Sequence, residues 1–330
     1  MVLGATGHIG SAVVRELLSR GTRVTAASRR TAPTANLAGL DITFSPGDAD
    51  DPAQVDRWTE GHDLVVDAAV PYPLWLFRPE TPAEAAPHDY ASARTDRILA
   101  AARRHRTTLA VVGSFTTLPH PGEARGDIEP AILRRSHPYF AVKEAVESRV
   151  LAAARDGLSA LIVNPVAVLG PWDGKPREHT FLPELLSGRV PLTSSREASF
   201  IDVRDVASAL CAAVWAGRTA EKIPLAGHTV RIGDMMDLAC SLHGARAPRL
   251  PGSTRLGAAL SYWAEAAFAV AGRRPPVPAL PMLLVRYGYP MPQSPAQRAL
   301  WPTLRPLADT LRDAVRWYSE IGYLEPAPRA

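Results

Sequence analysis

The sequence predicts an α/β protein in which a doubly wound parallel sheet is followed by a smaller, mostly helical C-terminal part. Three observations indicate this: a glycine-rich turn near the N-terminus, strand patterns that alternate with helix patterns as far as Pro165, and a looser, proline-rich pattern beyond that residue. The turn spaces Gly4, Gly7 and Gly10 three residues apart, between a strand pattern and an amphipathic helix pattern. This combination is typical of a Rossmann-type dinucleotide-binding domain.

The remaining elements follow in chain order from their local patterns. Short apolar and β-branched runs predict strands at residues 1–3, 22–27, 42–44, 63–68, 108–112 and 159–163. Helix patterns predict helices at residues 9–18, 51–58, 83–104, 139–155, 205–215 and 256–271. The first strand is short, so we expect either a trimmed strand or a start codon further upstream. We predict that residues 1–165 form the dinucleotide-binding domain, that 198–230 return to it, and that 166–197 and 231–330 form a lid.

Composition excludes several classes of protein. The chain is 46% hydrophobic and 21% charged, which is typical of a globular protein, and its arginines are scattered, so we expect no nucleic-acid partner. Cys211 and Cys240 make neither a disulfide framework nor a metal site, and no signal peptide opens the chain, so we expect a cytoplasmic protein without metal. The helix at 256–271 is too short and too charged for a membrane span, which leaves it as core or as the face of a homodimer.

The glycine-rich turn predicts where a nucleotide binds. We expect its backbone to contact the diphosphate through residues that lie on the turn and the first helical turn, namely Gly4, Thr6, Gly7, His8, Ile9 and Gly10. The second strand ends in Ser28, Arg29 and Arg30 with no acidic residue, which favours a 2′-phosphate and hence NADPH over NAD. Alternatively, the two arginines are solvated loop charges. Asp48 is expected to accept a hydrogen bond from the adenine amino group.

A second motif carries the chemistry. Tyr139 and Lys143 lie four residues apart on a predicted helix, so both side chains occupy one face, and the chain has only two other lysines. The ammonium, together with a cationic nicotinamide, is expected to lower the pKa of Tyr139 so that it exchanges a proton with a carbonyl or alcohol. Ser114, at the end of the strand at 108–112, is expected to bind the same oxygen, with Thr116 as the alternative.

The sequence resembles the extended short-chain dehydrogenase/reductases, the NAD(P)-dependent epimerase/dehydratase family, and most of all their dihydroflavonol and cinnamoyl-CoA reductase branch. The motifs that carry the resemblance are the glycine turn, Gly47-Asp48, residues 65–69, Ser114, Tyr139-x-x-x-Lys143, residues 164–171, residues 200–207 and residues 314–318. The resemblance implies further cofactor contacts at Ala49, Ala68, Ala69, Val70, Val112, Asn164, Pro165 and Val166. Two positions depart from the family: Ala91 replaces an Asn that supports the proton relay, and Asp67 replaces a His.

These motifs predict an NADPH-dependent reductase of a ketone or aldehyde, with the proton from Tyr139, while Lys143 holds the ribose. Aromatic residues in the segments expected near the nicotinamide suggest a bulky, apolar small-molecule substrate such as a polyketide, phenylpropanoid or terpenoid. We expect the substrate site to contain Tyr72, Trp75, Ser114, Thr116 and Trp172. Aromatic side chains of the helix at 256–271 either line this site or fill the core of the lid; they are Tyr262, Trp263 and Phe268.

Two alternatives remain open at this stage. The first is a nucleotide-sugar epimerase or dehydratase with tightly bound NAD(P), whose lid would clamp a diphosphate through Lys175, Arg177, Arg189 and Arg196. The second is a redox-sensing or scaffold protein that binds NADPH without turnover. The combination of Ser114, Tyr139 and Lys143 argues against the second alternative.

Overall fold

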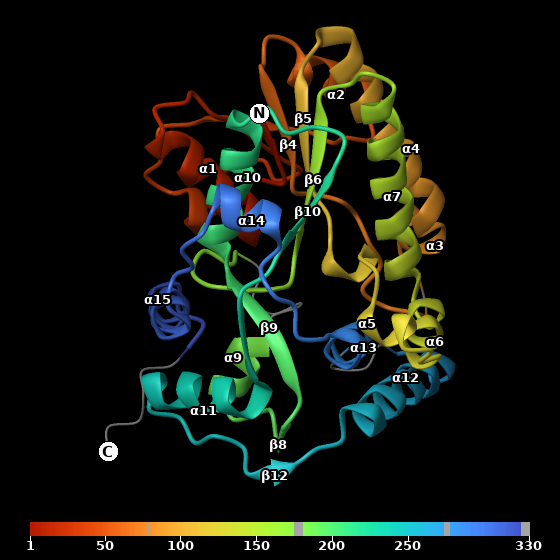
Figure 1. Ribbon diagram of the computed structural model, residues 1–330, viewed down its shortest axis with the longest axis vertical. Coiled ribbons are helices and arrows are strands. Elements are labelled where there is room, and N and C mark those ends of the chain that lie inside the picture. Colours follow the sequence, from red (N-terminus) through yellow and green to blue (C-terminus); the bar gives the residue numbers. More distant parts are fainter. Residues whose placement is uncertain (78, 175–180, 274–277, 325–330) are drawn as a thin grey trace.

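The computed structural model describes residues 1–324 except 78, 175–180 and 274–277. It has a layered upper half and a lower half made mostly of the segments that are predicted to form the lid (Figure 1). The upper half is built on a sheet of seven parallel strands, which confirms the predicted fold class. In spatial order the strands are β10 (Lys222–Leu225), β6 (Ala160–Pro165), β5 (Thr108–Val112), β4 (Leu64–Asp67), β1 (Val2–Leu3), β2 (Thr25–Ser28) and β3 (Thr43–Pro46).

Helices cover both faces of the sheet, and each face has its own apolar core. On one face α1 (His8–Ser19) packs on α10 (Val203–Trp215). On the other face α2 (Pro52–Thr59), α4 (Pro87–His105) and α7 (Pro138–Arg155) lie side by side (Figure 1). The order of the strands reverses at β1, which pairs with both β2 and β4, and a ligand crevice is expected at such a point.

The predicted elements are found with small shifts at their ends, and one helix is wrong. Strand β5 has the bounds that the sequence predicts, but the helix expected at 83–104 is two helices, α3 (Pro82–Ala85) and α4. They are separated at Ala86, whose φ of −133° and ψ of 62° are not helical. The cause is Pro87, because a proline ring disfavours helical geometry in the residue before it.

The lower half contains small sheets and most of the remaining helices. Strand β9 (Glu197–Asp202) pairs with β7 (Ala167–Leu169) and β11 (His228–Arg231), and β8 (Leu192–Thr193) pairs with β12 (Leu250–Pro251). The remaining helices are α9 (Phe181–Leu186), α11 (Ile232–His243), α12 (Thr254–Val270), α13 (Leu280–Tyr287), α14 (Pro295–Leu300) and α15 (Leu307–Glu320). Of these, α14 lies in the upper half, where it packs on α10 and β10 (Figure 1). Within the segment 198–230, helix α10 and strand β10 belong to the upper half, whereas β9 and β11 form part of a separate small sheet. The predicted domain division stays a prediction.

Short helices lie in the connections of the large sheet. One of them, η1 (Ala35–Leu37), lies between β2 and β3, and three follow one another between β5 and α7: η2 (Phe115–Thr117), α5 (Pro121–Ala124) and α6 (Glu129–Arg135). Helix α13 packs against α6, and α12 packs against α13. In the described part of the chain, no helix is both long enough and apolar enough to cross a membrane. Of the two alternatives for Trp263, filling the core of the lid is excluded, because its side chain lies on the outside of α12 and is 68% exposed.

The glycine turn depends on close backbone contacts. Gly4 has a φ of +76°, and a Cβ there would lie 2.7 Å from the Cβ of Ala69. A Cβ on Gly10 would lie 2.1 Å from the carbonyl oxygen of Gly4. Both neighbours are held in place by the strands, so α1 approaches β1 this closely only because these positions carry no side chain.

We predict that Gly10→Ala costs several kcal/mol of unfolding free energy, because the added methyl group meets backbone that cannot move aside. Gly21→Ala, at the other end of the same helix, is the control: its Cβ meets nothing within 4 Å, and only its φ of +73° opposes the change. The control should cost about 1 kcal/mol. Urea unfolding followed by circular dichroism measures both, and equal losses would contradict the prediction.

Candidate active site

The candidate catalytic residues meet at the carboxyl edge of the sheet. Ser114 follows β5, and Tyr139 lies in the first turn of α7 directly after Pro138, which favours a helix start. His137 caps this helix, since its Nδ1 accepts a hydrogen bond from Tyr139 N at 3.1 Å. Burial lowers the pKa of His137 to about 4, so at neutral pH the ring is a neutral acceptor. The cap therefore fixes where Tyr139 enters the site.

Three hydroxyl groups form a compact cluster. Tyr139 Oη lies 3.0 Å from Ser114 Oγ, and Thr116 Oγ1 lies 2.9 Å from the same atom. The backbone N–H of Thr116 also donates to Ser114 Oγ, at 3.2 Å. All three residues are buried. The structure thus brings together the two residues that the sequence singled out as proton donor and orienting hydroxyl, and Thr116 supports Ser114 rather than replacing it.

The pKa of Tyr139 is not the one that we expected. Burial raises it well above its usual value of 10, and hydrogen bonds from Ser114 and Thr116 oppose this only weakly, so the expected lowering is wrong for the protein without ligands. The phenol therefore keeps its proton at neutral pH. Burial also lowers the pKa of Lys143 to about 8, although Glu147 and Asp67 attract the ammonium.

Tyr72 stacks on this cluster. Its ring contacts the ring of Tyr139 edge to face, with centroids 5.0 Å apart, and Lys143 Nζ lies 5.4 Å from its centroid. Tyr72 is 41% exposed, so it lies between the buried cluster and solvent. Trp75 lies in the same loop and is half-buried. Tyr72 therefore lies beside Tyr139, and the role of Tyr72 and Trp75 in binding substrate stays a prediction.

A buried carboxylate that the sequence analysis missed holds the site together. Glu147 is fully buried on α7, and its Oε1 accepts hydrogen bonds from Ser114 N at 3.0 Å and Asn164 Nδ2 at 2.9 Å. Its Oε2 accepts from Thr117 Oγ1 at 2.6 Å and forms an ion pair with Lys222 Nζ at 2.7 Å. The signal was present: Tyr139, Lys143 and Glu147 are spaced by four, which places them on one helix face.

A second buried ion pair lies beside Lys143. Arg94 of α4 binds both carboxylate oxygens of Asp67, at 2.7 and 2.9 Å, and Asp67 also accepts from Ala69 N. Burial alone would raise the pKa of Asp67, but Arg94 outweighs burial and keeps that pKa below its usual value. This pair shapes the turn after β4, including Ala68 and Ala69, against which Gly4 packs.

The predicted nucleotide-binding part of the site is formed by the glycine turn, the start of α1 and the end of β2. No side chain of the described residues caps the N-terminus of α1, whereas α2, α7, α10 and α12 all have side-chain caps. This leaves backbone N–H groups for an anion. Thr6 Oγ1 lies 3.0 Å from Ser28 Oγ, which ties the turn to the end of β2. Arg29 and Arg30 are exposed, and within the described chain no carboxylate pairs with either.

The other residues predicted to bind the cofactor lie near the carboxyl ends of the strands, and their role stays a prediction. Asp48 follows β3 and accepts a hydrogen bond from Asp50 N, while Asp51 caps α2. Several are buried at the ends of strands or directly after them: Ala49, Val70, Val112, Asn164 and Val166. Pro165 ends β6. Tyr90 on α4 donates a hydrogen bond to Asp50, and burial raises its pKa to about 12.

Trp172 lies elsewhere than we expected. The guanidinium of Arg15 lies 4.5 Å from its ring centroid, and its carbonyl accepts hydrogen bonds from Asn36 Nδ2 at 3.0 Å and Ser11 Oγ at 3.3 Å. These contacts hold Trp172 against α1, at a φ of +72°. The indole ring of Trp172 thus packs against Arg15 of α1, and we leave Trp172 out of the substrate site.

Two of the four basic residues considered for a diphosphate clamp lie within the described chain, and both make contacts inside the protein. Arg189 binds Glu184 through two hydrogen bonds of 2.5 and 3.0 Å, and Arg196 donates to the carbonyl of Gly288 at 2.6 Å. Lys175 and Arg177 lie outside the described residues. The arginines that the sequence analysis considered for clamping a diphosphate therefore have partners inside the protein.

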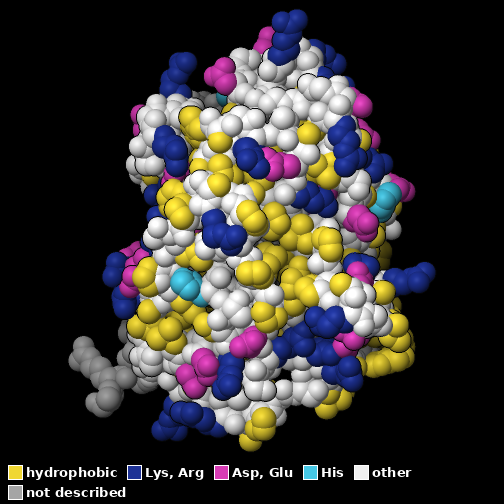
Figure 2. Space-filling model, viewed as in Figure 1, with side chains coloured by type: hydrophobic (Ala, Val, Ile, Leu, Met, Phe, Trp, Pro, Cys, Tyr) yellow, Lys and Arg dark blue, Asp and Glu magenta, His cyan; other side chains and the backbone are white. Residues whose placement is uncertain are grey.

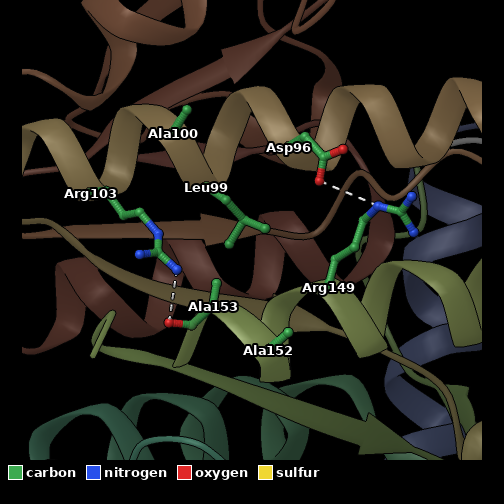
Figure 3. Close-up of a pocket in the computed structure, with 7 residues that line it drawn as sticks. All are labelled: Asp96, Leu99, Ala100, Arg103, Arg149, Ala152 and Ala153. Atoms are coloured by element: carbon green, nitrogen blue, oxygen red, sulfur yellow. Dashed lines mark hydrogen bonds and ion pairs between the residues drawn. The ribbon is translucent and has the colours of Figure 1, made fainter. Parts of the chain in front are cut away.

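A groove of about 370 Å³ lies away from this site, between α4 and α7 (Figure 3). Its lining includes the ion pair of Asp96 with Arg149, at 3.3 Å, and a hydrogen bond from Arg103 to the carbonyl of Ala153. None of the predicted catalytic or cofactor residues lines it. The groove therefore plays no part in the chemistry considered below.

Comparison with known proteins decides the family. The model of the NAD dependent epimerase/dehydratase family matches residues 1–233. The chain belongs to this family. It is accordingly an NAD(P)-dependent enzyme of the oxidoreductase type, which confirms the resemblance that the motifs indicate.

The similar proteins carry names that state different activities. The chain is 27% identical to a Synechocystis sp. protein whose name assigns it to dihydroflavonol 4-reductase, over 98% of this chain and 95% of that protein. It is 29% identical to sterol demethylase protein B of Methylococcus capsulatus, over 78% of each. A nucleoside-diphosphate-sugar epimerase structure from Pseudomonas aeruginosa shares the fold, with a TM-score of 0.75, 23% identity and 98% of both chains covered.

We predict that Glu147→Gln lowers the unfolding free energy by about 3 kcal/mol, because the new amide turns a donor toward the buried groups that bind Glu147 and leaves Lys222 without its charge partner. Glu144→Gln on the exposed side of the same helix is the control and should change stability by less than about 0.5 kcal/mol. Urea unfolding measures both. A Gln variant as stable as the control would contradict the role given to Glu147.

Proposed function

We propose that this enzyme is an NADPH-dependent reductase of a ketone or aldehyde on a bulky, largely apolar substrate. The observation that carries the proposal is the hydroxyl cluster of Ser114, Thr116 and Tyr139, in which a phenol that keeps its proton lies 3.0 Å from a second hydroxyl. A carbonyl oxygen needs both a proton donor and an orienting hydroxyl at this point. Bound NADPH supplies the hydride for such a reduction.

The residues of this chain divide the remaining work. Tyr139 donates its proton to the substrate oxygen as that oxygen gains negative charge, and Ser114 orients the oxygen. Lys143 binds the ribose of the cofactor and stabilises the phenolate that remains on Tyr139. Glu147 and Asn164 hold the backbone of Ser114 in place, since both bind it at 3.0 Å or less. Bulk solvent then returns the proton.

The apolar surroundings of Tyr139 support the substrate class. Buried Phe140, Leu280 and Tyr287 pack around Tyr139, with further apolar side chains at their edge: Leu74, Phe115, Leu133, Leu284 and Tyr289. A diphosphate would lose its hydration among these apolar groups, and Arg189, one of the residues considered for clamping it, is already paired with Glu184. The relative named sterol demethylase protein B is in accord with an apolar substrate.

We expect Tyr139→Phe to lower kcat/KM by about 100-fold or more, since the variant lacks the proton donor. Its affinity for NADPH should stay within about twofold of the wild type, because the ring is retained. Oxidation of NADPH with a panel of apolar ketones measures the rate, and Tyr323→Phe in the core of the lid serves as the control. Turnover of a sugar nucleotide without net NADPH oxidation would instead support an epimerase or dehydratase.

NADPH fits the residues present better than NADH does. The uncapped N-terminus of α1 and the glycine turn leave room for a diphosphate, and exposed Arg29 and Arg30 stand at the end of β2, where a dinucleotide carries its ribose 2′ group. No carboxylate occupies that strand end to bind a 2′-hydroxyl instead.

We predict that Arg29→Ala weakens NADPH binding by tenfold or more and leaves NADH binding nearly unchanged, because a charge-assisted contact is worth about 1.5 to 3 kcal/mol. Arg23→Ala, an exposed arginine just before the same strand, is the control. Fluorescence titration of both cofactors into the three proteins measures the effect. If Arg29→Ala leaves the preference unchanged, Arg29 is a solvated loop charge.

A further inference from the structure

Helix α12 carries its apolar residues on the outside. Leu256, Leu260, Trp263 and Val270 are 58%, 59%, 68% and 91% exposed, and the spacing between them places them on one side of the helix. We call this surface the α12 face. It is about 20 Å long at 1.5 Å per residue. Figure 2 shows apolar side chains at the lower right edge of the molecule, where Figure 1 draws α12.

The inner side of the same helix carries its only acidic residue. Glu265 is 1% exposed and accepts hydrogen bonds from the backbone N–H groups of Leu76 and Ala279. The ring of Tyr262 lies 6.0 Å from that of Phe77. The hydrogen bonds of Glu265 attach the inner side of α12 to the loop that carries Tyr72. The apolar residues of the opposite side therefore lie on the surface.

The surroundings of the α12 face are positively charged. Residues 244–273 contain four arginines and no acidic residue except buried Glu265. The half-buried Glu129 of α6 is already paired, because it binds two arginines, Arg286 on α13 and Arg255 on α12. Two further apolar side chains are exposed at α6: Ile128, directly before the helix, and Ile132 on it, at 74% and 57%.

We propose that the α12 face docks on the surface of an anionic lipid bilayer. Leu and Trp side chains on one helix face, flanked by arginines, match an interface of acyl chains and anionic headgroups. A second copy on the same face would bring the arginines of both chains together, which opposes a symmetric dimer. The helix lies on the bilayer without crossing it. This inference does not depend on the reductase activity.

Sedimentation with lipid vesicles tests the proposal, using the full chain without cofactor or substrate. Vesicles of phosphatidylcholine with about one-third phosphatidylglycerol should carry the protein down, and vesicles of phosphatidylcholine alone should carry much less. Raising the salt concentration should weaken the binding. The variant Leu260→Gln/Trp263→Gln should lower the partition coefficient by about tenfold or more.

Trp215→Gln is the matched control, because Trp215 is also exposed, at 51%, but lies on α10, where Arg20 covers its ring. It should bind vesicles as the wild type does, and circular dichroism should show all three proteins folded. Absence of binding to anionic vesicles, or equal binding by the α12 variant, overturns the proposal. The proposal is also overturned if analytical ultracentrifugation shows that the wild type is a dimer and the α12 variant is a monomer. That result would assign the α12 face to a second copy of the chain.

Discussion

The arrangement of the site depends on one buried carboxylate. Glu147 comes from α7, yet it binds groups from the ends of β5, β6 and β10, three strands that are neighbours in the sheet. A buried negative charge is tolerated only when it is paired and fully hydrogen-bonded, and here four donors satisfy it. All four donors must be in place at once to stabilise the carboxylate. The same hydrogen bonds therefore also fix the position of Ser114 relative to Tyr139.

The dryness of the site has a chemical consequence. Desolvation moves the pKa of Tyr139 up and that of Lys143 down, so each group is held closer to its neutral form than in water. The phenol keeps its proton at neutral pH, as it would in water, and the raised pKa makes it a weaker acid in the protein without ligands. The ion pair of Asp67 with Arg94 keeps a second negative charge next to Lys143, and this charge favours the ammonium against the effect of burial.

Sequence reasoning located the parts of this molecule that local rules determine. The glycine turn, the bounds of β5, and the face shared by Tyr139 and Lys143 follow from conformational freedom and periodicity over a few residues. Partners distant in the chain, such as Lys222 for Glu147, depend on how strands pair and could not be predicted locally. The break in the helix at Ala86 could have been predicted locally, because Pro87 follows it in the sequence.

Aromatic residues were the least predictable, because hydrophobicity does not say which surface a side chain will meet. Trp172 is used against Arg15 on α1, and Trp263 points outward from α12. For α12 the usual rule is inverted: the single carboxylate is inside, bound to two backbone N–H groups, and the large apolar groups are outside. Exposed apolar surface of this extent is costly in water unless something covers it. Docking of α12 on an anionic bilayer, as proposed above, would cover these apolar groups and bring the arginines at the ends of the helix near anionic headgroups.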